Sequence, residues 1–408
     1  MAATLAPRST GNPQPAAAAA QAPSMPIPFT RAARRKSIQA YTGTFTLTAG
    51  STTQLPPILL PPAGFIRDIE MVLTVTSTGN TATVAAAAVS DIPFNIINSM
   101  LVTNAAGDTI YVPINGYQLY LIDKWSGIYQ QPFCDPRADQ AFIPLTTGAA
   151  ATAGSGIVFM RLPFEIDPRD AFCALPNLAA NKAYEIVMNL ASTAQIWSGG
   201  TPPNGVVTVS VVMTMNFWSQ PNPTTAGGNV NVETSPAGVG SVSLFRLQTI
   251  PVGGGGNKVF QLINVGNAIR WTAFSLYDNA SPSKRTDADW PPITYLRLNN
   301  DPLFYKPLNN WLSNMRRANG YGGSYGGATI AKDIAMGLDT GVYILSDFIE
   351  QHGSVEVDSP RDQYLVTLES TLWQLEGNLF GNNANILNVL SNEIKPISAT
   401  AMYSLNYI

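Results

Sequence analysis

The sequence repeats one order of elements in its two halves, and this repeat limits the folds that the chain can adopt. In the first half, strand-like residues 94–114 lead into a short apolar helix expected over 115–126. In the second half, strand-like residues 292–299 are followed by a helix that Pro307 is well placed to start. Both halves then continue as strands. Two similar β modules without an evident catalytic set indicate a building block rather than an enzyme.

Alternation of apolar and polar residues defines the strands. Phe45 and Leu47 alternate with Thr44 and Thr46, and the same period of two runs along 206–218, so that one face is buried and the other is wetter. The other predicted strands are 65–77, 94–103, 108–114, 156–166 and 182–190 in the first half, and 241–250, 258–264, 268–277, 292–299, 341–349, 363–370, 385–397 and 401–407 in the second.

A change of composition separates the two modules. Residues 219–240 are rich in Pro, Gly, Asn and Thr and lack periodicity, which is typical of a linker. We therefore expect an N-terminal arm over 1–40, a first module over 41–218 and a second over 241–408. About eight short strands per module, joined by short connections, predict an all-β chain of two tandem antiparallel jelly rolls. A short helix is expected in each, after about the fourth strand.

Composition favours a protein covered by copies of itself. Charged residues are only 12% of the chain, about half the usual share of a globular domain. Cys134 and Cys173 give no disulfide framework, which favours synthesis in a reducing cytoplasm. No apolar run reaches the ~18 residues of a membrane-spanning helix. The Ala-rich start is interrupted by Arg8 and Pro13, so we reject a secretion signal.

The N-terminal arm is the basic part of the chain. Residues 1–29 are rich in Ala and Pro and are expected to stay disordered when free. Thr30 is predicted to cap a short helix that runs through Gln39.

Four positive residues are the candidate functional residues of this arm, and no acid precedes Asp68. They are Arg31, Arg34, Arg35 and Lys36. The preferred interpretation is contact with the anionic lipid of a membrane, at on the order of 1 kcal/mol per residue. The alternatives are that the arm joins neighbouring subunits or contacts nucleic acid, although a cluster without interleaved aromatic residues is a weak nucleic-acid signal.

No motif assigns a chemical site, and we predict no catalytic, cofactor-binding or metal-binding residues. Gly322–Gly326 fits G-x-S-x-G, but a helix precedes it instead of a strand and the only histidine, His352, has no placed partner. The acids around Asp287 lack the spacing of a calcium loop, and the two cysteines lack zinc spacing. Gly253–Gly256 lacks the Lys-Ser/Thr of a phosphate loop and fits a hairpin turn.

Order and spacing of segments resemble a known viral family. The segments are Phe65–Ile69, Ser90–Asn95, the helix through Trp125, Trp311–Arg317 and Gly341–Tyr343. Together they resemble the double-jelly-roll major capsid protein, closest to the tectivirus type of membrane-containing icosahedral bacteriophage. The resemblance implies a trimer whose six sandwiches form a pseudo-hexameric capsomer on a shell around an internal membrane. It also implies assembly in the host cytoplasm, location in the virion, and contacts with neighbouring trimers, penton proteins and minor capsid or membrane proteins.

The competing hypothesis is a β-sandwich module of a phage spike that binds or processes carbohydrate. Exposed aromatic rings could stack on sugars, and a pair of acids could hydrolyse them. No such acid pair stands out. The five tryptophans near regular elements are expected to pack in the core, and these are Trp125, Trp218, Trp271, Trp311 and Trp373.

Overall fold

Two successive β-sandwiches form the molecule. The computed structural model describes residues 26–80, 91, 93–104, 106–126, 141–142, 152–179, 183–197, 205–225, 228–229, 231–236, 240–253, 255–263, 266–278, 284–285, 287–318, 341–345, 365–366, 372–378 and 385–396.

The first sandwich has two facing sheets. One sheet has the order β1-β11-β4-β8-β7, with β9 beside β4. Its strands are β1 (Arg35–Leu47), β11 (Val206–Trp218), β4 (Phe65–Asn80), β8 (Thr152–Pro163), β7 (Ala141–Phe142) and β9 (Leu175–Pro176). The facing strands have the order β6-β5-β10-β2, with β3 beside β10. They are β6 (Thr109–Ile114), β5 (Ile97–Thr103), β10 (Glu185–Leu190), β2 (Thr53–Gln54) and β3 (Ile58–Leu59).

The second sandwich repeats this arrangement. One half has the order β14-β22-β16-β19, with β20 beside β16, and the other has the order β15-β21-β17-β18. The strands are β14 (Ser241–Pro251), β22 (Asn385–Pro396), β16 (Ala268–Asp278), β19 (Val342–Leu345), β20 (Leu365–Val366), β15 (Asn257–Gln261), β21 (Trp373–Asn378), β17 (Ile293–Leu298) and β18 (Asp301–Pro307). In both sandwiches the first strand pairs with the last, and the last with the third, which is the jelly-roll order.

A helix follows the fifth strand of each jelly roll, if β2 and β3 are counted as one broken strand. Helix α2 (Gly116–Trp125) begins at a capping box, in which Asn115 and Gln118 each bond the other's backbone N–H. Helix α4 (Leu308–Ala318) follows Pro307. Shorter elements are α1 (Phe29–Ala32), α3 (Thr193–Ile196), η1 (Phe94–Ile96), η3 (Asp287–Asp289) and the hairpin β12 (Thr224–Thr225) with β13 (Gly228–Asn229).

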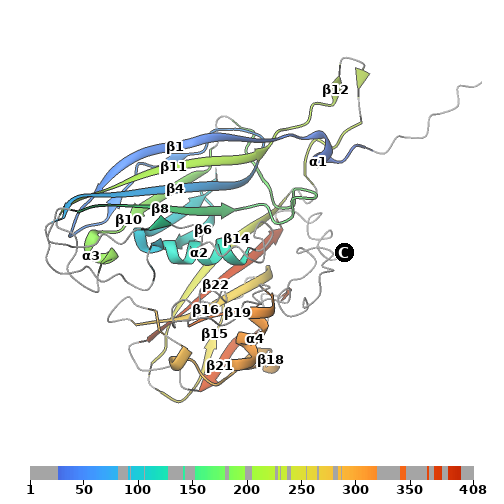
Figure 1. Ribbon diagram of the computed structural model, residues 1–408. Helices are drawn as coiled ribbons and strands as arrows, with labels where there is room; N and C mark the ends of the chain where they lie inside the picture. Colours follow the sequence, from blue (N-terminus) through green and yellow to red (C-terminus); the bar gives the residue numbers. More distant parts are fainter. Residues whose placement is uncertain are drawn as a thin grey trace, which may run out of the picture.

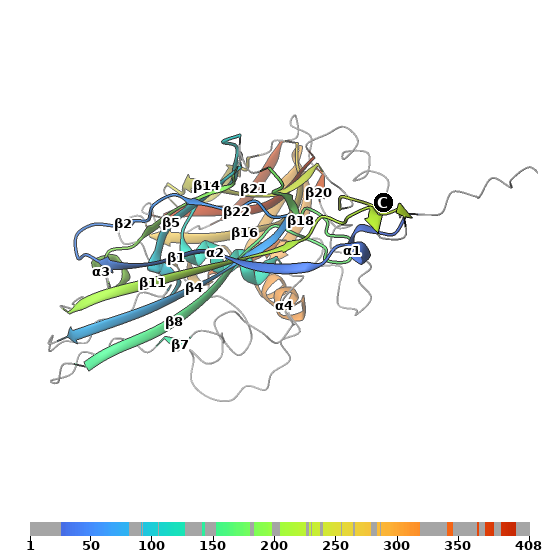
Figure 2. The same cartoon turned by 90° about the horizontal axis from the view of Figure 1, so that it is seen from above.

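The two jelly rolls share one sheet. Strand β6 of the first lies parallel to β14 of the second through the pair Tyr111 and Phe245, so ten strands form one sheet. Figure 1 shows the resulting layers, with the β1 sheet above, the shared sheet in the middle and β15, β21 and β18 below. From above, β1, β11, β4 and β8 lie side by side (Figure 2).

Period-two sequence patterns explain the first sheet. On β11, Val207, Val209 and Val211 are buried while Thr208 and Ser210 are half-buried. Because successive side chains of a strand point to opposite faces, one face of β11 enters the core. The prediction of two antiparallel jelly rolls, each with a short helix, is confirmed.

Several local predictions were wrong. Strands β18 and β21 were missed. Of the strand expected over 363–370, the structure describes only residues 365–366, and these form β20. Turn residues Asn299 and Asn300 have φ of 52° and 69°, so the chain reverses there and β18 pairs with β17. The strand expected over 401–407 lies outside the described residues.

Candidate functional site: the basic segment and the contact between the jelly rolls

All four candidate basic residues are exposed, but they do not share a helix. Helix α1 contains Arg31 and ends at Ala32, and β1 begins at Arg35, so the helix predicted through Gln39 was wrong. The strand forms because residues from Arg35 onward pair with β11, starting with Arg35 opposite Trp218. Arg34 lies between helix and strand, where its backbone carbonyl accepts a 2.8 Å hydrogen bond from the Ser219 N–H.

A small apolar cluster fixes the segment just before the basic residues. Phe29 is 1% exposed and meets Phe65 edge-on, with ring centroids 5.2 Å apart, and Trp218 at 6.2 Å. Its backbone N–H donates to Glu233 Oε2 at 3.0 Å. Next to it, Ile27 bonds the backbone of 231–233 at 2.9 and 3.0 Å. Residues 27–29 are therefore held at one end of the first jelly roll (Figure 1).

Charged groups surround Trp218, which belongs to this cluster. The fully buried Glu165 carboxylate accepts from Arg67 Nε at 2.8 Å and from Trp218 Nε1 at 2.5 Å. The guanidinium groups of Arg35 and Arg67 lie 4.8 and 5.3 Å from the Trp218 ring centroid. Cations over an indole face are attracted by its negative π surface. Arg35 therefore also stabilises the start of β1, while Arg31 and Arg34 are exposed on α1 and the turn.

Aromatic packing joins the two jelly rolls. Tyr111 of β6 and Phe245 of β14 are both buried, with ring centroids 4.6 Å apart. Phe164 lies on the other side of Tyr111 at 5.6 Å, and Trp271 lies 6.0 Å from Phe245. The Tyr111 hydroxyl donates to the Pro163 carbonyl at 2.7 Å. Burial raises the pKa of this phenol well above its ordinary value, so the hydroxyl stays a donor.

Helix α2 carries a second contact between the jelly rolls. Arg270 of β16 donates to Asn392 Oδ1 at 2.8 Å and reaches the Ser126 carbonyl, at the end of α2, at 3.5 Å. Lys284 Nζ donates to the Tyr117 hydroxyl at 2.5 Å. Burial lowers the pKa of Arg270 to about 10, because a charged group loses its hydration there. The cation still faces the carbonyl end of a helix, where positive charge is favoured.

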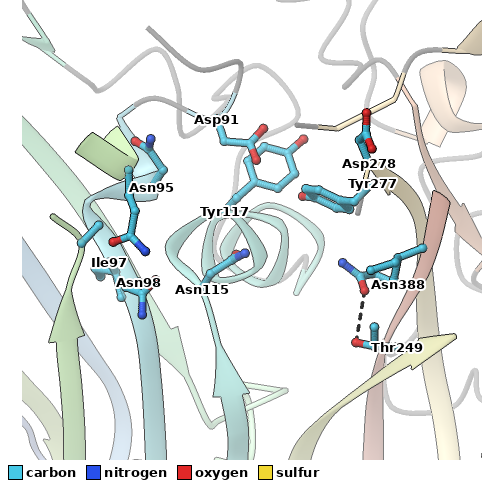
Figure 3. Close-up of a pocket in the computed structure, with 13 residues that line it drawn as sticks. Asp91, Asn95, Ile97, Asn98, Asn115, Tyr117, Thr249, Tyr277, Asp278 and Asn388 are labelled. Atoms are coloured by element: carbon cyan, nitrogen blue, oxygen red, sulfur yellow. Dashed lines mark hydrogen bonds between the residues drawn. The ribbon is translucent and has the colours of Figure 1, made fainter. Parts of the chain in front are cut away.

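A pocket of about 420 Å³ opens between the jelly rolls. Figure 3 shows Asp91, Asn115 and Tyr117 of the first jelly roll opposite Tyr277 and Asp278 of the second. Asp278 is held by Arg285 at 2.9 Å, and Asn388 on the pocket wall accepts from Thr249 at 3.2 Å. These bonds tie the lining to the surrounding fold.

The residues that were weighed as candidates for a chemical site are hydrogen-bonded or buried within the fold where the structure describes them. Asp287 accepts from Gly341 N–H at 2.8 Å and from Tyr343 at 2.5 Å. Cys173 is buried, and burial raises the pKa of its thiol, which keeps it unreactive. The five tryptophans named above are all buried, as predicted. His352, Cys134 and the segment 322–326 lie outside the described residues.

Two kinds of feature are absent from the described residues. They contain no group of three or more His, Cys, Asp or Glu placed to hold a metal ion. Within the same part of the chain, no helix is both long and apolar enough to cross a bilayer.

Sequence reasoning missed the residues that organise this region. Tyr111, Phe245 and Trp218 were treated as ordinary strand residues, yet they join the jelly rolls and anchor the basic segment. One signal was present: Ile66-Arg67 and Ile269-Arg270 repeat the same pair on corresponding strands. In both, the arginine sits at a register shift against the last strand of its jelly roll.

Solved structures share this fold. No protein-family model and no curated protein matches the sequence. The chain is similar to the STIV major capsid protein, with a TM-score of 0.56 and 13% identity, covering 92% of this chain and 100% of that chain. It is also similar to the atomic structure of Sulfolobus Turreted Icosahedral Virus (0.57, 12% identity, 91% and 96%) and to a quasi-atomic model of the PBCV-1 virus capsid (0.50, 13%, 89% and 93%). The chain thus has the double-jelly-roll fold that these viral capsid structures share.

Proposed function

We propose that this chain is the major capsid protein of an icosahedral virus, and that it assembles as trimers whose six jelly rolls form a pseudo-hexameric capsomer. The observation that carries the proposal is the internal repeat: two jelly rolls with the same strand order, joined edge to edge by β6 and β14. Two similar units in one chain, repeated by a threefold axis, give six nearly equivalent sides that tile a surface.

Solution mass tests the trimer. Sedimentation equilibrium of the purified chain should give three times the 43.6 kDa monomer mass, and electron microscopy should show six-lobed particles. A monomer at every concentration, or a particle that forms only with added sugar, would favour the spike-module hypothesis instead.

We further propose a virion of the tectivirus type, in which the shell encloses a membrane and penton and minor capsid or membrane proteins complete the assembly. The basic residues Arg31, Arg34, Arg35 and Lys36 then face the lipid. The support is their exposure and their position next to an anchor that holds the preceding chain at one end of the first jelly roll. No sequence-specific contact with nucleic acid is proposed.

Vesicle flotation tests the lipid contact. The double variant Arg31→Ser/Arg34→Ser removes two cations while leaving the β1 ladder and the stacking of Arg35 intact. At about 1 kcal/mol per residue, its partition to anionic vesicles should fall roughly 30-fold. The matched control Lys258→Ser/Lys395→Ser removes the same charge from the second jelly roll and should float like the unmodified protein. Equal flotation of both variants argues against a lipid role for these arginines.

A further inference from the structure

Within one chain, the two jelly rolls meet through one edge strand of each. Each jelly roll also has the strand that corresponds to the other's edge strand, and the contact within the chain does not use it. Within the chain, the edge strand β6 of the first jelly roll meets the edge strand β14 of the second. In the part of the chain that the structure describes, the corresponding strands β18 and β1 each end a sheet and pair on one side only.

The correspondence between these strands follows from position and pairing. Strands β6 and β18 are each the fifth strand of their jelly roll and lead directly into α2 and α4. Strands β14 and β1 are each the first strand and pair with the last strand, as Ser241 with Pro396 and Arg35 with Trp218. Counted from these anchors, Leu303 takes the place of Tyr111 and Gln39 takes the place of Phe245.

The outer edge of β18 is apolar. Leu303 is 41% exposed and Tyr305 is 56% exposed, and Ile293 on the neighbouring strand is 37% exposed. The Tyr305 ring lies against Tyr295 at 5.4 Å, so it is presented in a fixed orientation. Exposed apolar groups gathered at one sheet edge indicate a contact surface.

The outer edge of β1 complements it. Ile38, Tyr41 and Phe45 are only half-buried at this edge, although they contact the core. Since β6 and β14 run parallel, a copy of that contact places the start of β18 beside the start of β1. The exposed carboxylate of Asp301 then lies near the exposed cations of Arg35 or Lys36.

We infer that β18 of one copy docks on β1 of the next, repeating the contact between β6 and β14. This inference rests on the proposed function, because it names the interface of the proposed trimer. The contact is head-to-tail: each copy offers β18 on one side and β1 on the other, so three copies close a ring in which all six jelly-roll junctions are of one kind.

Cysteine cross-linking tests the pairing directly. In a Cys134→Ser background, the double variant Gln39→Cys/Leu303→Cys should give covalent trimers on mild oxidation. Cys173 is retained because it is buried. Each single variant alone should stay unlinked, whereas a mixture of the two should give covalent dimers. Linked Gln39→Cys dimers would show β1 against β1 and would overturn the inference.

Charge insertion tests the surface without a covalent bond. Tyr305→Asp should abolish the trimer in sedimentation experiments. The matched control Val259→Asp changes a residue that is 51% exposed on β15, at the opposite edge of the same sheet, and should keep the trimer. Circular dichroism must show both variants folded.

The outcomes separate this inference from the proposed function. A stable trimer that neither cross-links through residues 39 and 303 nor dissociates with Tyr305→Asp overturns the β18–β1 contact and leaves the capsomer proposal standing. An unmodified chain that remains monomeric at all concentrations overturns both.

Discussion

Corresponding central strands of the two jelly rolls are buried differently. On β4, Glu70 and Thr76 are exposed while Met71 and Leu73 are buried, so one face is open to solvent. On β16, every residue except Asp278 is buried, so both faces are covered. The second jelly roll receives its outer cover from the first, through Arg270 and the end of α2. The first jelly roll has no such cover among the described residues, so more of its outer surface stays open in the single chain.

A new carboxylate should lower the free energy of unfolding strongly on β16 and weakly on β4. Ser275→Asp places a carboxylate where both faces of β16 are covered, and it should cost more than about 4 kcal/mol of unfolding free energy. Thr74→Asp on β4 introduces the same carboxylate at a half-buried position and should cost less than about 1 kcal/mol. Urea denaturation of both variants measures the difference. Equal costs would mean that the two strands are covered alike in solution.

The next largest effect is expected from truncating Tyr111, the aromatic residue that packs between the two jelly rolls. Tyr111→Ala removes a fully buried ring from between the jelly rolls and should cost about 3–5 kcal/mol. Tyr305→Ala removes an exposed ring from the corresponding strand and should change the stability of the dilute subunit by less than about 1 kcal/mol. Thermal unfolding at low protein concentration compares them, and a similar loss for both would contradict the comparison.

The two corresponding arginines, Arg67 and Arg270, differ in their bonding partners. Arg67→Ala leaves the buried Glu165 carboxylate without its 2.8 Å partner and should cost about 3 kcal/mol. A second change, Glu165→Gln, should recover part of that cost because it removes the buried charge. Arg270→Ala should cost less, since its partners are an amide oxygen and a carbonyl rather than a buried carboxylate. A double-mutant cycle measures the coupling of Arg67 with Glu165, and its absence would contradict the assignment.

The smallest expected effect concerns the pH dependence of the first jelly roll. Burial raises the pKa of Asp68, although a 2.6 Å hydrogen bond from Asn216 and nearby arginines oppose this. A carboxyl with a raised pKa in the folded state stabilises the fold when protonated, and this contribution is lost as pH rises through that pKa. Asp68→Asn should therefore give a small increase in Tm at pH 7 that disappears below the ordinary carboxyl pKa. A pH series of melting curves checks it, and a gain that grows toward low pH would refute the sign.

The repeated architecture could be predicted from the sequence because it rests on local patterns. The alternation along β1 and β11 reports burial on one face, and the Pro307 start of α4 needs no tertiary information. Strand β18 was missed although Asn299-Asn300 between two strand-like runs is a two-residue hairpin signal. The helix predicted through Gln39 failed because pairing with β11 outweighed local propensity.

The candidate site was only partly predictable. The positive charge of Arg31 and Arg34 is visible in the sequence, but the stacking of Arg35 on Trp218 joins residues far apart in the chain. The junction of Tyr111 with Phe245 likewise depends on how two finished sandwiches meet. Such contacts carry no local periodicity, so a single sequence does not reveal them.

The anchoring of Phe29 beside the end of β11 has a mechanical consequence. A pulling force on the chain before Ile27 acts first on the cluster around Phe29 and then along the axis of β1. Strand β1 is paired with β11 from Arg35 to Leu47. Load applied along antiparallel strands is shared by all the backbone bonds of that ladder at once, rather than opening them one after another. Under the proposed contact of the basic segment with lipid, resistance to detachment is therefore set by the length of these two strands.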